Sequence, residues 1–198
     1  MTARLGLAAF FIIALLAATP AAAHDGAGVQ GGFVAGLLHP VSGPDHMLAM
    51  VAVGLWGAFL GRPLIVVLPV VFPTVMSVGA VLAMVGVPLP PVEFGIAISV
   101  LALGGAIAGG IRAPVWAASV IVGIFAIFHG YAHGQELPSL ADPVAYSVGF
   151  VLATGLLHVA GITIGLLANV RGGMVVIRGA GALIAASGVY FLYRSLAG

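Results

Sequence analysis

The sequence predicts an all-α integral membrane protein with six transmembrane helices that follow a cleavable signal peptide. Hydrophobic residues make up 62% of the chain and charged residues 6%, and the mean hydropathy is +1.27, values far outside the range of a soluble domain. A chain of 198 residues has room for about six or seven spans of ~20 residues each and for no separate soluble domain. Short segments rich in Gly, Pro and Arg separate the apolar stretches, so each span can be placed to within a few residues.

Residues 1–23 have the composition of a secretory signal peptide. MTAR supplies a positive charge, LGLAAFFIIALLAA a short apolar core and ATPAAA a small-residue end, and cleavage is predicted after Ala23. The mature chain, residues 24–198, then forms a single polytopic transmembrane domain. A retained signal anchor is the alternative, because the apolar core of a signal and a short span overlap in length.

Arginine placement predicts how the spans are oriented. The six spans are expected at residues 28–60, 63–86, 91–110, 113–134, 143–169 and 173–195. With the mature N-terminus outside, four arginines lie at cytoplasmic ends and only Arg194 lies outside, as the positive-inside rule requires; the four are Arg62, Arg112, Arg171 and Arg178. We therefore expect a multi-pass protein of the bacterial inner membrane with a periplasmic N-terminus.

Charge and cysteine content exclude several functions. A net charge of +1 with no lysine gives no basic surface for nucleic acid. No cysteine is present, so disulfides and thiolate ligands are excluded, and a metal site must use imidazole, carboxylate, amide, thioether or backbone oxygen. The sequence has no GxxxxGK[ST] motif, which excludes ATP hydrolysis by this chain.

The first mature span carries the motif HPVSGPDH at residues 39–46. Pro40 and Pro44 each remove a backbone donor and Gly43 permits unusual dihedral angles, so we expect a broken helix here. Irregular backbone at membrane depth is tolerated where it is buried in protein or lines a wet cavity, and ion sites of transporters are commonly built there. Asp45 in mid-membrane costs about 2.5–3.5 kcal/mol without a partner. A bound divalent cation would be such a partner for Asp45 and for the neighbouring His46.

A second motif, FHGYAHGQE at residues 128–136, ends the fourth span. His129 and His133 are one turn apart and Glu136 is three residues further on, so all three share a helical face if the helix continues past Gly134. Two imidazoles one turn apart can bind one metal ion. Hydrogen-bonded packing is the alternative, because this spacing alone is a weak signal.

Three further residues are candidate ligands outside the two motifs. His158 is a lone histidine in the fifth span, and a hydrogen bond to a neighbouring helix is its alternative role. His24, the predicted mature N-terminus, could chelate a metal with its amine and imidazole, although such termini are usually flexible and solvated. Glu93 lies near an outer end, as do Asp25, Glu136 and Asp142. This acidic bias suits attraction of a cation, whereas simple decoration of outer loops is the alternative for Glu93 and Asp142.

The six spans divide into two halves of three. The halves must have opposite topology because each contains an odd number of crossings, and the first span of each half carries a histidine motif. This pattern is typical of a 3+3 inverted-repeat transporter whose site lies at the repeat interface.

Both motifs resemble those of the HupE/UreJ family of secondary nickel or cobalt permeases, and the resemblance covers essentially the whole chain. It implies import of Ni²⁺ or Co²⁺, as substrate rather than cofactor, for a hydrogenase, urease or cobalamin pathway. The positions carried over are His39, Asp45, His46, His129, His133 and Glu136. The implied partners are the metal ion and the lipid bilayer, and a homo-oligomer and a downstream metallochaperone are compatible with this role.

The motifs do not specify the metal or exclude every other role. Imidazole and carboxylate suit Ni²⁺, Co²⁺, Zn²⁺ and Cu²⁺, and an unconstrained site would bind Cu²⁺ most tightly, so selectivity must come from geometry. A metal-binding or assembly subunit without transport is one alternative. An intramembrane metalloenzyme is another, but the chain has no HExxH motif and no nucleophile beside a base, so we expect no enzymatic activity.

Overall fold

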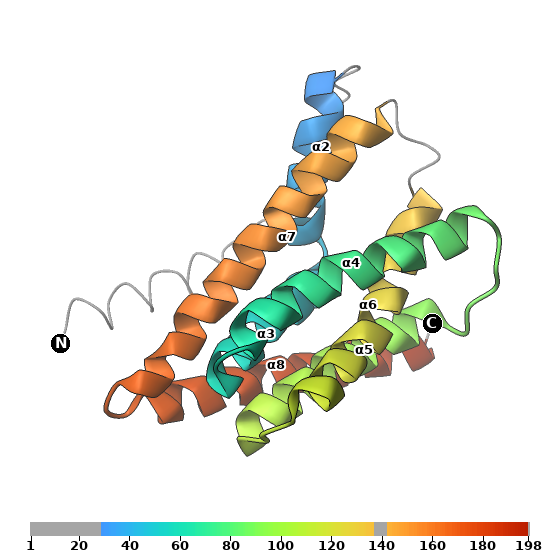
Figure 1. Ribbon diagram of the computed structural model, residues 1–198. Helices are drawn as coiled ribbons and strands as arrows, with labels where there is room; N and C mark the ends of the chain where they lie inside the picture. The colour runs from blue at the N-terminus through green and yellow to red at the C-terminus, as the bar shows by residue number, and fades with distance from the viewer. Residues whose placement is uncertain (1–28, 137–141, 198) are drawn as a thin grey trace.

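The computed structural model describes residues 29–136 and 142–197, and within these two stretches the chain forms helices and turns but no strand (Figure 1). The helices are α2 (Val29–Ser42), α3 (Pro44–Leu60), α4 (Leu64–Met84), α5 (Val92–Gly109), α6 (Val115–Glu136), α7 (Pro143–Gly165), the short 3₁₀ helix η2 (Leu166–Asn169) and α8 (Gly173–Ala197). In the described part of the chain, five helices are long and apolar enough to cross a membrane. The chain is therefore a multi-pass membrane protein, and the part that the structure describes is all-helical.

The helix bounds agree closely with the predicted spans after the first. Helices α4, α5, α6 and α8 begin and end within two residues of their predicted spans, and α7 with η2 covers residues 143–169. The first predicted span is divided into α2 and α3, with 14 and 17 residues, so the predicted break is confirmed. The signal peptide, His24 and Asp25 lie outside the described residues, and the inverted repeat and the count of six spans stay predictions.

Three helix contacts organise the bundle. Helix α7 lies against α2 and α3, α4 lies against α6, and α5 lies against α8 (Figure 1). Helix α3 also contacts α4 and α5, and every one of its residues from Ala49 to Phe59 is buried. Because α3 is buried along this stretch and contacts α4, α5 and α7, it is the central helix of the bundle.

Glycines allow the paired helices to touch through their backbones. A Cβ atom on Gly54 of α3 would overlap the His158 carbonyl of α7, and one on Gly161 of α7 would overlap the Val51 carbonyl of α3. Gly130 of α6 meets the backbone of α4 in the same way. Close contact through small residues is the usual means of helix association in membranes, where lipid is as apolar as the side chains. These contacts determine which side of α6 and of α7 lies against the neighbouring helix. The two helices carry three of the histidines.

The exterior is apolar and the interior holds polar side chains. Large aliphatic residues are exposed along α4 and α7, including Val66, Val70, Val148 and Leu156. Such a surface suits lipid rather than water. Among the described residues, the buried polar side chains are Ser99, His129, His133, Thr154 and His158. Buried polar groups in a membrane protein require partners, and they identify the region where function is to be sought.

Candidate metal site

The site begins at the break between α2 and α3, where Gly43 has extended backbone angles (φ −94°, ψ 104°). Pro44 follows in the first turn of α3, a position that tolerates proline because its missing N–H would have no partner within the helix. For the same reason Pro44 cannot continue α2, since it has no N–H to give to the Pro40 carbonyl. Pro40, by contrast, lies inside α2, and the helix continues past it to Ser42. The break therefore comes at Gly43, directly before Pro44.

Asp45 and His46 make a local hydrogen-bonded pair at the start of α3. Oδ1 of Asp45 accepts the backbone N–H of His46 at 2.8 Å and lies 2.9 Å from Nδ1 of the His46 ring. The first N–H groups of a helix have no partner within it, and a carboxylate satisfies one of them here. Because a carboxylate accepts, Nδ1 of His46 donates to it, and in a neutral ring Nε2 then has the lone pair. That Nε2 atom is buried and has no hydrogen-bond partner among the described residues.

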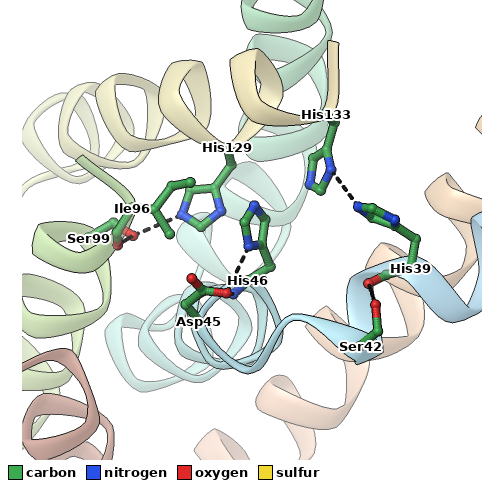
Figure 2. A network of polar contacts seen from close by, with 8 residues as sticks. All are labelled: His39, Ser42, Asp45, His46, Ile96, Ser99, His129 and His133. Carbon is green, nitrogen blue, oxygen red and sulfur yellow. Dashed lines mark hydrogen bonds and ion pairs between the residues drawn. The ribbon is translucent and has the colours of Figure 1, made fainter. Parts of the chain in front are cut away.

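Helix α6 contributes His129 and His133, one turn apart on one face, and both are buried. Gly130 and Gly134 follow the two histidines, and a Cβ on either would overlap the backbone of α4. The glycines therefore hold one side of α6 against α4. The histidines reach from the adjoining side of α6 toward the start of α3 (Figure 2).

The four imidazoles of the two motifs form one cluster. The His46 ring points from α3 into the space between His129 and His133 (Figure 2). Its centroid lies 4.8 Å from that of His129 and 4.6 Å from that of His133. His39 of α2 joins from the other side, with its Nε2 3.0 Å from Nδ1 of His133, although the two residues are 94 positions apart in the sequence. The structure thus brings together five of the residues predicted from the motifs: His39, Asp45, His46, His129 and His133.

Aromatic side chains surround the cluster. Phe72 of α4 lies 5.4 Å from the His129 ring, and Phe150 of α7 lies 4.5 Å from the His133 ring, measured between centroids. Tyr146 of α7 is 5.7 Å from His39. These rings lower the local dielectric constant, which strengthens electrostatic interactions within the cluster. Sequence reasoning did not single out these rings, because an aromatic residue in an apolar span is usually a packing residue.

Ser99 of α5 is a further polar neighbour that sequence reasoning missed. Its Oγ donates to the Ile96 carbonyl at 2.6 Å and lies 2.9 Å from Nε2 of His129 (Figure 2). A helical serine bonded to a carbonyl of the preceding turn is common, so its sequence position carries no functional signal. The second ring nitrogen of His129, Nδ1, is buried and has no hydrogen-bond partner in the part of the chain that the structure describes.

The cluster therefore offers two adjacent imidazole donors. Nε2 of His46 and Nδ1 of His129 are both buried and without hydrogen-bond partners within residues 29–136 and 142–197, and an orphaned buried polar atom is costly. A cation bound to both nitrogens would remove this cost. Across the same residues, no group of three or more His, Asp or Glu side chains is arranged to hold one metal ion. These two nitrogens are therefore the candidate donors of a two-donor metal site, called the seat below, and the described histidines do not form a closed cage.

The other predicted ligands are not among these five clustered residues. Glu136 is the last residue of α6, and its side chain, like all of His24, lies outside the described structure. Glu93 is exposed in the first turn of α5. His158 is buried on α7 with its ring 5.6 Å from Phe72, the same aromatic ring that contacts His129. Asp142 accepts the Ala145 N–H at 2.9 Å and caps α7, which is a structural role.

Comparison with known proteins gives matches along most of the chain. The sequence profile of the HupE / UreJ protein family matches residues 12–191. Protein HupE of Rhizobium leguminosarum bv. viciae is 44% identical over 176 residues, which cover 88% of this chain and 92% of that protein. No solved structure matches the chain.

Proposed function

Because the chain belongs to the HupE/UreJ family, we propose that it is a secondary transporter that imports a divalent transition metal, Ni²⁺ or Co²⁺, through the histidine cluster. The observation that carries the proposal is the pair of adjacent buried imidazoles, His46 and His129. Each has a ring nitrogen without a hydrogen-bond partner among the described residues. Neutral imidazole is a good ligand for Ni²⁺ and Co²⁺, and a chain without cysteine offers no thiolate to compete.

The proposed path passes two histidine pairs in succession. His39 and His133 form the pair nearer the end of α6, and His46 and His129 form the next pair. His129 and His133 are four residues apart, a rise of about 6 Å along the helix. An ion that moves by this distance exchanges one imidazole pair for the next without being released into lipid. Conduction requires binding that is strong enough to admit the ion and weak enough to let it leave, and two-donor seats suit this requirement.

Helix packing supports the predicted inverted repeat. If the first three spans correspond to the last three, α2 with α3 corresponds to α6, α4 to α7 and α5 to α8. Exchange of the halves turns the contact of α2 and α3 with α7 into the contact of α6 with α4, and it leaves the contact of α5 with α8 unchanged. All three main helix contacts obey this exchange. The proposed seat then joins His46 of one repeat to His129 of the other, at the repeat interface.

We infer the direction of transport from the arginine placement and the cellular role from the family. The arginines at predicted cytoplasmic ends favour a periplasmic N-terminus in a bacterial inner membrane, so the ion would enter from the periplasm. Without an ATPase motif in this chain, transport would be driven by the membrane potential, by a coupled ion or by trapping in the cytoplasm. A hydrogenase, urease or cobalamin pathway, reached through a metallochaperone, would consume the metal.

A metal-binding or assembly subunit would bind the ion at the same seat but would not carry it across the membrane. A metalloenzyme would in addition convert a substrate. Purified protein in proteoliposomes distinguishes these roles from transport. We expect Ni²⁺ or Co²⁺ to accumulate inside wild-type vesicles, driven by an inward metal gradient, and His46→Ala to reduce the initial rate to that of empty vesicles.

Ser42→Ala is the matched control, because Ser42 is exposed at the same break and donates only to the His39 carbonyl, at 2.8 Å. It should keep most of the wild-type rate. Metal binding by the wild type in detergent, with no accumulation in vesicles, would contradict transport and favour the binding subunit. An initial uptake rate in His46→Ala equal to that of the wild type would contradict the proposed seat.

A further inference from the structure

The hydroxyl group of Ser99 lies between two partners, the Ile96 carbonyl at 2.6 Å and Nε2 of His129 at 2.9 Å (Figure 2). Ser99 is on α5 and His129 on α6, and both side chains are completely buried, each 0% exposed. Both side chains are thus shielded from bulk solvent. The direction of each hydrogen bond is therefore fixed by the protons that these three groups carry.

A serine hydroxyl has one proton, and a carbonyl has none to give. The contact of 2.6 Å with Ile96 is a hydrogen bond only if Ser99 donates its proton there. Ser99 Oγ can then only accept from His129, so Nε2 of His129 must carry the ring proton. In a neutral imidazole the other nitrogen, Nδ1, consequently has the lone pair.

We infer that Ser99 is a positioning residue that holds His129 in the Nε2–H tautomer and so presents Nδ1 as the metal donor. The inference rests on the proposed function, since it names how one half of the metal seat is prepared. Outer partners of this kind set the tautomer and the ring orientation of metal-binding histidines.

The other half of the seat is prepared through the opposite nitrogen. Asp45 binds Nδ1 of His46 at 2.9 Å and leaves Nε2 with the lone pair, whereas Ser99 binds Nε2 of His129 and leaves Nδ1. Within the described residues these two remaining nitrogens have no hydrogen-bond partner, and their rings are 4.8 Å apart with an interplanar angle of 84°. Ser99 thus does for His129, from another helix, what Asp45 does for His46 from the adjacent position.

The tautomer can be measured without any transport. Protein labelled with ¹⁵N and ¹³C in histidine is reconstituted in lipid bilayers, freed of metal with a chelator and held at a pH well above the ordinary imidazole pKa of about 6.5. Nitrogen–carbon correlation spectra report which ring nitrogen bears the proton, and comparison with His129→Gln assigns the His129 signals. We expect the proton on Nε2 in the parent and in Ser99→Thr, and a changed Nε2–H signal with an added Nδ1–H form in Ser99→Ala.

Ni²⁺ affinity is the second readout. Loss of an outer partner typically lowers metal affinity about 10- to 100-fold, and we expect this loss in Ser99→Ala, with affinity recovered in Ser99→Thr. The matched control is Ser187→Ala on α8, because Ser187 is half-buried on another helix and donates to the Leu183 carbonyl at 3.1 Å; it should change neither signal nor affinity.

A parent spectrum with the proton on Nδ1 would overturn the inference even if no variant folds. An affinity loss in Ser99→Ala without any change in the His129 signals would overturn it too, because the role would then be packing alone. If the spectra agree with the inference and vesicles still show no uptake, the proposed transport fails and the positioning role stands.

Discussion

The two histidine motifs reach the same cluster by opposite backbone designs. In the first, Gly43 and Pro44 break the helix, and His39 and His46 come from separate helices on either side of the break. In the second, α6 continues without interruption from Val115 to Glu136, and His129 and His133 are one turn apart on it. The broken motif can direct its two rings from different angles, whereas the continuous motif presents its rings as a fixed pair.

The motifs also differ in what orients their central histidines. His46 is held by Asp45, its neighbour in the chain, and the same carboxylate oxygen accepts the backbone N–H of His46 in the first turn of α3. His129 is held by Ser99, which belongs to α5. A break in the backbone thus supplies the local polar groups that a continuous helix lacks, and the continuous helix obtains its partner from a neighbouring span.

The largest effect is expected when the break itself is removed. In Gly43→Ala with Pro44→Ala, α2 and α3 should join, and the N–H of His46 should bond to the Ser42 carbonyl instead of to Asp45. In a continuous helix the Cα atoms of residues 39 and 46 are about 10.5 Å apart along the axis. In the structure, the ring centroids of His39 and His46 lie 4.9 Å and 4.6 Å from that of His133. A continuous helix would move the two rings apart, and this arrangement would be lost. We expect vesicle uptake close to background.

Pro40→Ala is the control for this double variant, because Pro40 already lies inside α2 without breaking it. It should keep most of the uptake. Substantial uptake by the double variant, with equal amounts of protein in the vesicles, would show that the break does not create the seat.

A smaller effect is expected when only the charge that orients His46 is removed. Asp45→Asn keeps an oxygen that can accept the backbone N–H but loses the carboxylate, so it holds the His46 ring less firmly. Loss of an outer partner predicts Ni²⁺ affinity lower by about 10- to 100-fold, measured by titration of the purified protein. Asp142→Asn is the matched control, since Asp142 also accepts a backbone N–H, from Ala145 at 2.9 Å, but caps α7. Equal affinities of the two variants would contradict the role of Asp45.

The smallest effect should come from the support of the continuous motif. In Gly130→Ala the added methyl group meets the Met76 carbonyl of α4, so α6 must shift, and overpacking of this kind costs about 1–3 kcal/mol. The free energy of unfolding in mixed micelles measures this cost. Gly123→Ala tests the same substitution on the same helix, where the nearest atom, Val75 Cγ2, is 3.9 Å from the new methyl group. Its stability should be unchanged or higher, by roughly 0.5–1 kcal/mol, because alanine is the better helix former. Equal destabilisation of both variants would contradict a specific contact between α4 and α6 at Gly130.

The sequence alone determined the class of the protein, the ends of the helices after the first predicted span and the break at HPVSGPDH. It also indicated five of the clustered residues through its two motifs. These features depend on properties that are local in the chain: a run of apolar residues long enough for a bilayer, a proline without its N–H, and histidines one helical turn apart. The contact between Asp45 and His46 is of the same kind, because adjacent residues at the start of a helix are within reach whatever the rest of the chain does.

Only the tertiary structure decided which partner each of the other histidines meets. The contact between His39 and His133, the aromatic rings of Phe72 and Phe150, and the hydroxyl of Ser99 all come from different helices. In an apolar span a serine or a phenylalanine looks the same whether it faces lipid, a helix or a histidine. Its partner depends on how the helices rotate and how closely they approach, and glycine contacts such as that of Gly130 with the α4 backbone set both.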